Sequence, residues 1–235
     1  MPIFRLTEQL RFPPPDYADP DGLLAMGGDL SPERLLLAYR MGIFPWYGEE
    51  TPILWWSPHP RLVLFPDELK VSRSLQRVIR KGTFQVTVDS AFPDVIAGCA
   101  QMRARNREGT WIVPEMSAAY CGLHELGYAH SVETWHQGEL VGGLYGVALG
   151  HVFYGESMFT KRSDASKVAL AHLVHLLRGW HFEMIDCQMT TRHLLNLGAR
   201  EIPRREFLGR LATAVNASHQ AGSWAHRLPA AEEYP

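Results

Sequence analysis

Cysteines are few in this sequence and a long apolar run is lacking, and each absence excludes a class of protein. The three cysteines are odd in number and widely spaced, so they indicate neither a disulfide framework nor a zinc site. The eleven histidines include no H-x-x-x-H pair and no Cys/His cluster. No apolar segment approaches the ~18 residues of a membrane span, and the N-terminal segment MPIFRLTEQLRFPPP lacks the apolar core of a signal peptide. We therefore expect a cytoplasmic, metal-free protein without a membrane attachment.

Length and composition are those of an ordinary globular protein. The chain has 235 residues, of which 46% are hydrophobic and 20% are charged. This length predicts one large domain or a large domain with a small companion. The formal net charge of −2 does not by itself favour a nucleic-acid-binding protein.

Local charge differs from the net charge. The segment DELKVSRSLQRVIRKG predicts an amphipathic helix over residues 70–81. Its apolar face comprises Val71, Leu75, Val78 and Ile79, and its basic face comprises Lys70, Arg73, Arg77, Arg80 and Lys81. Two further groups of arginines lie at residues 103–107 and 200–210. Each group alone is explained by a solvated surface, but three on a mildly acidic chain favour a phosphate-binding surface.

The first sixty residues are rich in proline, glycine and tryptophan and predict an irregular, compact segment with one helix. Ser31 is a natural N-cap for that helix, Pro32 suits its first position, and Gly42 stops it. Two aromatic loops follow, around Trp46 and around residues 55–56. These aromatics either pack a small domain or wall a pocket at a domain junction, and Trp46 is the pocket candidate.

From about residue 61 the pattern becomes regular. It predicts a strand at 83–90, helices at 90–102 and 114–127, and a strand meander from 130 to 159 with a turn at Gln137-Gly138. A long helix after Asp164, a strand ending at residue 188 and two further helices complete the order. We expect an α+β chain: a small N-terminal α/β domain (residues 1–60) before a mixed-sheet domain (residues 61–235) of the acyl-CoA N-acyltransferase (GNAT) kind.

Polar groups interrupt two apolar strands between residues 151 and 188. Glu156 lies in HVFYGESMF, and Asp186 and Gln188 end FEMIDCQ. Alternation along a strand places Asp186 and Gln188 on one face and Cys187 on the other. Buried polar side chains require partners, so the pattern indicates either a hydrogen-bond network at the strand ends or a functional site.

The segment after the meander argues against an acetyl-CoA enzyme. Such enzymes hold the coenzyme pyrophosphate on a Q/R-x-x-G-x-G/A loop at a helix N-terminus. The corresponding segment here reads FTKRSDASK and has no such loop. The sequence therefore predicts no coenzyme A and a different activated acyl donor.

Several motifs in order resemble the leucyl/phenylalanyl-tRNA–protein transferases. They are GGDLSPERLLLAYRMGIFPWY, ILWWSPHPR, EGTWI, ELVGGLYGV, YGESMF, ASKVAL, IDCQ and LGAREIPRREF, over roughly residues 20–210. The resemblance implies transfer of leucine or phenylalanine, and less well methionine, from aminoacyl-tRNA to proteins that begin with arginine or lysine. The modified proteins would enter the N-degron degradation pathway.

The implied reaction needs little general acid–base catalysis and no cofactor. The donor is an activated ester, and an α-amino group has an unperturbed pKa near 7.7–8.0, so a useful fraction is free amine at neutral pH. Positioning of the amine and stabilisation of developing charge remain to be supplied. The resemblance assigns these roles to Asp186 and Gln188 as a catalytic pair. Either Asp186 or Glu156 could bind the acceptor's cationic side chain, and the sequence does not decide between them.

The resemblance also suggests donor-binding residues. The apolar wall for leucine or phenylalanine would comprise Leu144, Phe153, Met158, Leu173 and Ile185, where Leu173 replaces a phenylalanine of some relatives. Trp46 and Trp111 are candidates to stack on the terminal adenosine, and Glu156 is a candidate for bonding the adenosine or the amine. The candidates for tRNA phosphate contacts are Arg73, Arg77, Arg80 and Lys81.

Three other functions share part of this pattern. A coenzyme A-dependent N-acetyltransferase shares the fold but requires the missing loop. A peptidoglycan aminoacyl-tRNA ligase shares donor and fold but is usually a longer, duplicated chain. A tRNA-binding module would keep the basic helix and have no need of Asp186, Gln188 or the apolar wall.

Overall fold

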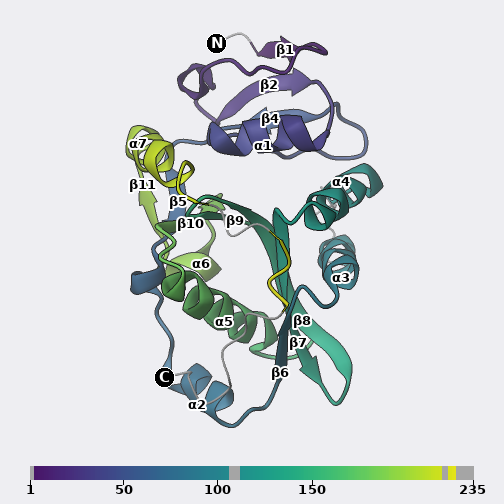
Figure 1. Ribbon diagram of the computed structural model, residues 1–235, viewed down its shortest axis with the longest axis vertical. Helices are drawn as coiled ribbons and strands as arrows, with labels where there is room; N and C mark the ends of the chain where they lie inside the picture. The colour runs from purple at the N-terminus through teal and green to yellow at the C-terminus, as the bar shows by residue number, and fades with distance from the viewer. Residues whose placement is uncertain (1–2, 106–111, 219–221, 226–235) are drawn as a thin grey trace.

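A computed structural model describes residues 3–105, 112–218 and 222–225. It contains two β-sheets, a small one formed by the N-terminal part of the chain and a larger one formed by the rest (Figure 1). Among the described residues, none of the helices combines the length and the apolar content that crossing a bilayer requires.

The composition of the N-terminal segment predicts an irregular structure, and this prediction is wrong. The segment forms a four-stranded sheet in the order β1-β2-β4-β3. The strands are β1 (Phe4–Leu6), β2 (Leu23–Gly27), β3 (Phe44–Pro45) and β4 (Leu54–Trp56), accompanied by the 3-10 helix η1 (Pro15–Tyr17) and by α1 (Pro32–Arg40). Strands of two to five residues are too short for alternation to be visible, and prolines and glycines separate them.

Helix α1 begins and ends where the sequence predicts. The Ser31 hydroxyl accepts a hydrogen bond from the Arg34 backbone N–H at 3.4 Å, and Pro32 occupies the first turn. Gly42 follows with a φ of 71°, a conformation that glycine adopts without strain. These local signals fix the direction of α1, and with it the side chain of Tyr39, which is fully buried.

The larger sheet has seven strands in the order β11-β5-β10-β9-β8-β7-β6. Their bounds are β5 (Arg61–Leu64), β6 (Gln85–Val88), β7 (Ala129–His136), β8 (Glu139–Leu149), β9 (Val152–Thr160), β10 (Met184–Gln188) and β11 (Arg200–Ile202). All pairs are antiparallel except β9 and β10, which are parallel and joined by α5 (Ala165–Gly179). This antiparallel meander with one helical crossover confirms the expected α+β, N-acyltransferase-like class.

Helices cover both faces of the large sheet. Helices α3 (Phe92–Arg105) and α4 (Pro114–Glu125) pack on one face and α5 on the other (Figure 1). Leu144 of β8 accordingly joins the core on the α5 side, and its neighbour Tyr145 joins the core on the α3 and α4 side. This two-sided cover explains why β8 is buried along most of its length, unlike a strand with one solvated face.

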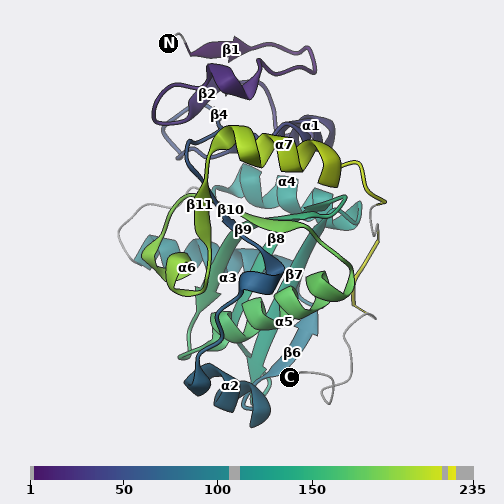
Figure 2. The ribbon, with the colours of Figure 1, turned by 90° about the vertical axis from the view of Figure 1, so that its left-hand side faces the viewer.

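The remaining elements lie around the edge of the large sheet. They are the 3-10 helix η2 (Pro66–Glu68), α2 (Arg73–Arg80), α6 (Arg192–Asn196) and α7 (Arg204–Ala214). Helix α2 lies at the end of the molecule opposite the small sheet (Figure 2), and its apolar side packs on Ala165 and Val168 at the start of α5. Asp164 does precede α5, but its carboxylate pairs with Lys167 at 2.8 Å and does not cap the helix.

One apolar core connects the two sheets. Leu24 and Trp55 of the small sheet belong to the same buried cluster as Val95 and Met116 of α3 and α4. The small sheet ends with β4, and the large sheet begins with β5 at Arg61. The division into domains at residues 1–60 and 61–235 remains a prediction.

Candidate active site

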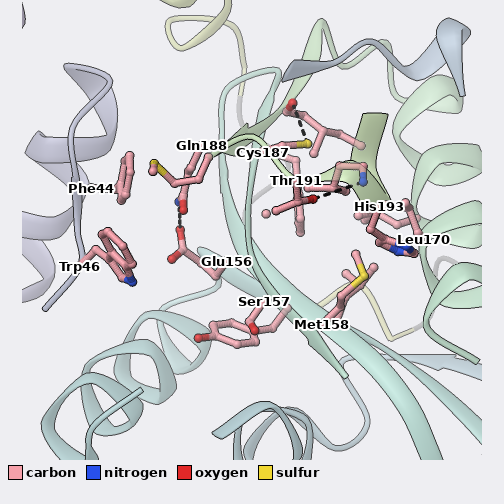
Figure 3. A pocket seen from close by; sticks show the side chains of 18 of the residues that line it. Phe44, Trp46, Glu156, Ser157, Met158, Leu170, Cys187, Gln188, Thr191 and His193 are labelled. Carbon is pink, nitrogen blue, oxygen red and sulfur yellow. Dashed lines mark hydrogen bonds between the residues drawn. The ribbon is translucent and has the colours of Figure 1, made fainter. Parts of the chain in front are cut away.

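A cavity of about 410 Å³ opens where β9 and β10 separate (Figure 3). The two strands pair only from Met184–Asp186 to Val152–Tyr154, after which β9 continues without β10. The cavity is lined by Phe44, Pro45, Trp46, Leu144, Tyr145, Phe153, Gly155, Glu156, Ser157, Met158, Leu170, Leu173, Ile185, Cys187, Gln188, Met189, Thr191, His193 and Leu194. Most of these side chains are apolar, so the interior suits an apolar group.

Many of the residues singled out from the sequence meet in this cavity. Its walls include Trp46, Leu144, Phe153, Glu156, Met158, Leu173, Ile185 and Gln188. Trp111 lies outside the described residues, and Asp186 does not line the cavity. Sequence reasoning misses the rim residues Thr191 and His193, which follow β10, and Phe44 beside Trp46.

An extra residue in each of two strands shapes the site. In β9, Gly155 pairs with Gly146 and Ser157 with Tyr145, so Glu156 has no partner on β8. In β10, Asp186 pairs with Val63 and Gln188 with Leu62, so Cys187 is the extra residue. The expected alternation is therefore wrong: Cys187 and Gln188 both line the cavity, and Asp186 does not. Bulges commonly redirect side chains beside functional sites.

Glu156 is buried at the centre of a hydrogen-bond network. Its Oε1 lies 2.8 Å from the Tyr39 hydroxyl and its Oε2 lies 2.8 Å from the Tyr120 hydroxyl. The Gln188 Nε2 donates to Oε1 at 2.8 Å (Figure 3). Burial raises the pKa of Glu156 to about 7, and the three hydrogen bonds partly oppose that rise. The carboxyl group therefore titrates near neutral pH.

Asp186 forms a buried ion pair with Arg61 of β5. The Arg61 Nε and Nη2 donate to the two carboxylate oxygens at 2.8 and 2.6 Å, and both side chains are almost fully buried. The guanidinium lies between the rings of Phe44 and Phe207, 4.7 and 4.6 Å from their centroids. This geometry corrects the expectation that Asp186 itself holds the attacking amine, because its charge is neutralised and its side chain does not line the cavity.

Asp186 instead supports the backbone of Gln188. Its Oδ1 accepts the Gln188 N–H at 2.9 Å, and Gln188 has a φ of 62°, which is uncommon for a residue with a Cβ. Among the described residues none donates to the Gln188 Oε1, while its Nε2 is held by Glu156. The amide therefore presents its carbonyl oxygen to the cavity as a hydrogen-bond acceptor.

The rim of the cavity combines aromatic and polar groups. Trp46 is 38% exposed, and its ring packs edge-on against Trp56 at a centroid distance of 5.5 Å. His193 lies across the opening from Trp46 (Figure 3). Burial lowers the pKa of His193, and the nearby Lys167 lowers it further. Burial raises the pKa of Cys187, so this thiol is not a thiolate nucleophile.

The predicted basic helix exists as α2. Its cationic side chains are exposed, and none forms an ion pair with another described residue. Arg73, Arg77, Arg80 and Lys81 surround one shallow hollow on α2. The arginines near the C-terminal end differ, because Arg200 pairs with Glu68 at 2.9 Å and Arg210 with Glu183 at 2.7 Å. The group at residues 103–107 lies outside the described side chains. Among the described side chains of these groups, α2 therefore gathers four cations that pair with no described acidic side chain, whereas Arg200 and Arg210 are paired.

The described residues contain no group of three His, Cys, Asp or Glu side chains arranged to hold a metal ion. The site consists of neutral hydrogen-bonding groups and one buried carboxyl above an apolar cavity. A mixed sheet that parts around such a cavity defines the class of N-acyltransferase-like proteins.

Sequence comparison identifies the family within this class. Residues 63–212 match the profile of leucyl/phenylalanyl-tRNA protein transferase, and residues 28–59 match that of its N-terminal domain. The chain belongs to the leucyl/phenylalanyl-tRNA–protein transferase family, and it is an aminoacyltransferase.

Named relatives agree over nearly the whole chain. A leucyl/phenylalanyl-tRNA–protein transferase of Syntrophobacter fumaroxidans is 67% identical over 95% of this chain and 96% of its own length. One from Anaeromyxobacter sp. (strain Fw109-5) is 59% identical over 95% of both chains. Among solved structures, a GCN5-related N-acetyltransferase from Kribbella flavida matches 72% of this chain and 60% of its own, with 12% identity and a TM-score of 0.34.

Proposed function

We propose that this protein transfers leucine or phenylalanine, and less well methionine, from aminoacyl-tRNA to the α-amino group of proteins that begin with arginine or lysine. The product would be an N-degron that directs the protein to degradation in the cytoplasm. The observation that carries the proposal is the apolar cavity of about 410 Å³ at the parting of β9 and β10, with the Gln188 amide at its wall, in a chain of this family.

The reaction is the aminolysis of an ester. The acceptor nitrogen attacks the aminoacyl carbonyl carbon, the bond to the tRNA ribose oxygen breaks, and the nitrogen loses a proton as the ribose oxygen gains one. In this proposal, Gln188 accepts a hydrogen bond from the attacking N–H through Oε1, which orients the amine and stabilises the positive charge that develops on it. Asp186 acts through Gln188, by holding its backbone.

We infer the choice of amino acid from the cavity walls. Leu144, Met158 and Leu173 form part of an apolar slot that suits an unbranched Cβ. Valine or isoleucine would place a methyl group against the wall, and overpacking of a filled site is unfavourable. Trp46, exposed at the rim, offers a ring on which the terminal adenosine can stack, an interaction worth about 1–3 kcal/mol. Arg61 neutralises Asp186, which leaves that carboxylate no charge for the acceptor's cationic side chain.

Helix α2 is proposed to contact the tRNA acceptor stem. It packs against the start of α5, and the Lys167 charge of α5 lies near His193 at the cavity rim. The start of α5, with Lys167 and its partner Asp164, therefore connects the cavity rim to the arginines of α2. Phosphate contacts of this kind position a nucleic acid without reading its sequence.

Neutralising α2 should weaken tRNA use in a salt-dependent way. Changing Arg73, Arg77, Arg80 and Lys81 to glutamine is expected to raise KM for aminoacyl-tRNA while kcat stays unchanged. The slope of log kcat/KM against log salt should fall by about 0.7–0.9 for each phosphate that the helix no longer binds. Arg200→Gln and Arg210→Gln, at ion-paired surface positions, are the matched controls and should leave the slope unchanged. An unchanged slope in the α2 variant would remove α2 from the tRNA surface.

One assay tests the function itself. Labelled Leu-tRNA is incubated with the protein and an acceptor that begins with lysine or arginine. Label should pass to the acceptor, not to a matched acceptor that begins with glutamate, and RNase should abolish the transfer. Val-tRNA should be a poor donor. Turnover of acetyl-CoA, or transfer to a peptidoglycan precursor in place of the protein, would overturn the proposal, and tRNA binding without transfer would indicate a binding module.

A further inference from the structure

Three oxygen-bearing side chains from three separate elements form a closed triangle beside the cavity. The hydroxyls of Tyr39 on α1 and Tyr120 on α4 lie 2.6 Å apart. Each lies 2.8 Å from a different carboxyl oxygen of Glu156 on β9. All three residues are buried. Every side of the triangle has a hydrogen-bond length.

Counting protons decides the charge state of this triangle. Each tyrosine hydroxyl supplies one proton, and an ionised carboxylate supplies none. Two protons cannot serve three contacts, so ionised Glu156 would leave one pair of oxygens facing each other with no proton between them. A protonated Glu156 supplies the third proton, and each group then donates once around the ring.

The direction of the ring follows from Gln188. Its Nε2 donates to the Oε1 of Glu156, which also receives the Tyr39 hydroxyl, so Oε1 is the acceptor oxygen of the acid. The acid proton therefore lies on Oε2 and points to Tyr120, whose own proton points to Tyr39. Burial raises the pKa of both tyrosines well above the ordinary value, so neither phenol loses its proton.

We propose that Tyr39 and Tyr120 are positioning residues of the transfer reaction: they orient Glu156, which burial favours as a neutral acid, and thereby fix the Gln188 amide with its Oε1 toward the attacking amine. This inference rests on the proposed function. A neutral acid also benefits the chemistry directly. A carboxylate beside the acceptor amine would favour its ammonium form, which is not a nucleophile, whereas a neutral acid leaves it as free amine.

The surroundings of Glu156 favour the neutral form. Burial is the main cause that raises the pKa of Glu156, and Asp186 on β10 adds a smaller effect in the same direction although it is paired with Arg61 on β5. Tyr145 of β8 packs edge-on against Tyr120 and is buried. Among the described residues, no cation is hydrogen-bonded to Glu156. The groups that contact it from α1, α4 and β10 are therefore neutral.

Glu156→Gln is the decisive variant, because glutamine reproduces the neutral acid. Its Nε2 can donate to Tyr120, and its Oε1 can accept from Tyr39 and Gln188. We expect this variant to transfer within about threefold of the wild-type rate near pH 6. The ratio of variant to wild-type rate should then rise by about tenfold per pH unit above the Glu156 pKa near 7. Ionisation of the acceptor amine is common to both proteins and cancels in this ratio.

Tyr39→Phe provides the second test. The ring opens, and Glu156 loses the Tyr39 hydrogen bond that lowers its pKa. The fall of activity relative to Glu156→Gln should therefore begin at a higher pH than in the wild-type protein, with KM for aminoacyl-tRNA unchanged. A purely structural role would lower activity equally at all pH values and would overturn the proposal.

Infrared spectroscopy gives a readout that does not depend on transfer. At pH 6 the wild-type protein should show the carbonyl band of a protonated carboxylic acid, and Glu156→Gln should lack it. A missing band, or a fall of transfer above about a hundredfold at all pH values in a folded Glu156→Gln protein, would show that the anion is required. If the wild-type protein transfers no amino acid, the proposed function fails, and the infrared band still decides the charge of Glu156.

Discussion

Replacing Arg61 by methionine is expected to lower the free energy of unfolding by about 3–5 kcal/mol, the range found when one partner of a buried ion pair is removed. Asp186 has no exposed surface, and Arg61 supplies both hydrogen bonds to its carboxylate oxygens in the ion pair. Methionine fills the space between Phe44 and Phe207 but leaves the carboxylate without a cation. Chemical denaturation of the purified protein measures the change.

A paired variant separates charge from packing. Arg61→Met combined with Asp186→Leu removes both charges and should recover more than half of the missing stability, because an apolar pair of similar volume is often tolerated in place of a buried ion pair. The double variant should remain poor at transfer, since the Gln188 N–H loses its acceptor. If Arg61→Met lowered the free energy of unfolding by less than about 1 kcal/mol, the result would contradict the structural role given to the pair.

Gln188→Ala is expected to lower the single-turnover rate of transfer by about 10²–10³-fold, the usual effect of removing one preorganised hydrogen-bonding group at a reacting centre. KM for aminoacyl-tRNA should change little, because Gln188 is one small part of the cavity wall. Quench-flow measurement with saturating acceptor protein isolates the chemical step.

The matched control lies next to Gln188 in the same strand. Cys187 also lines the cavity, and its thiol contacts the Ile185 carbonyl at 3.8 Å. Cys187→Ala should therefore keep the rate within about threefold. If Gln188→Ala also stayed within threefold, the amide would have no part in the reaction, and positioning by the cavity walls alone would remain.

Local signals make much of the fold predictable. Ser31, Pro32 and Gly42 mark the two ends of α1, and Gln137 and Gly138 form the turn between β7 and β8 with φ values of 53° and 81°. The small sheet escapes prediction because its strands are too short to show a period. The two bulges escape it because a single extra residue, Glu156 or Cys187, leaves no mark on composition.

The cavity walls are largely predictable from the sequence, and the partners of the polar groups are not. A carboxylate in an apolar strand requires partners, which the sequence does indicate, but Tyr39 and Tyr120 lie 117 and 36 residues from Glu156. On their helices both tyrosines look like ordinary core residues. In the sequence Arg61 likewise marks only the start of a domain, since its partner Asp186 is 125 residues away. Distant pairing of this kind is decided by topology, which a single sequence does not display.

The contact between Tyr39 and Glu156 joins the N-terminal part of the chain to the large sheet. Phe44, Trp46 and Tyr39 come from the N-terminal part of the chain, and Glu156 and Gln188 come from the large sheet. Neither part contains the cavity alone, so a donor that binds there, as proposed above, would add its binding free energy to the association of the two parts. Donor binding and the docking of the small sheet would then be linked equilibria, and each would strengthen the other by the same factor.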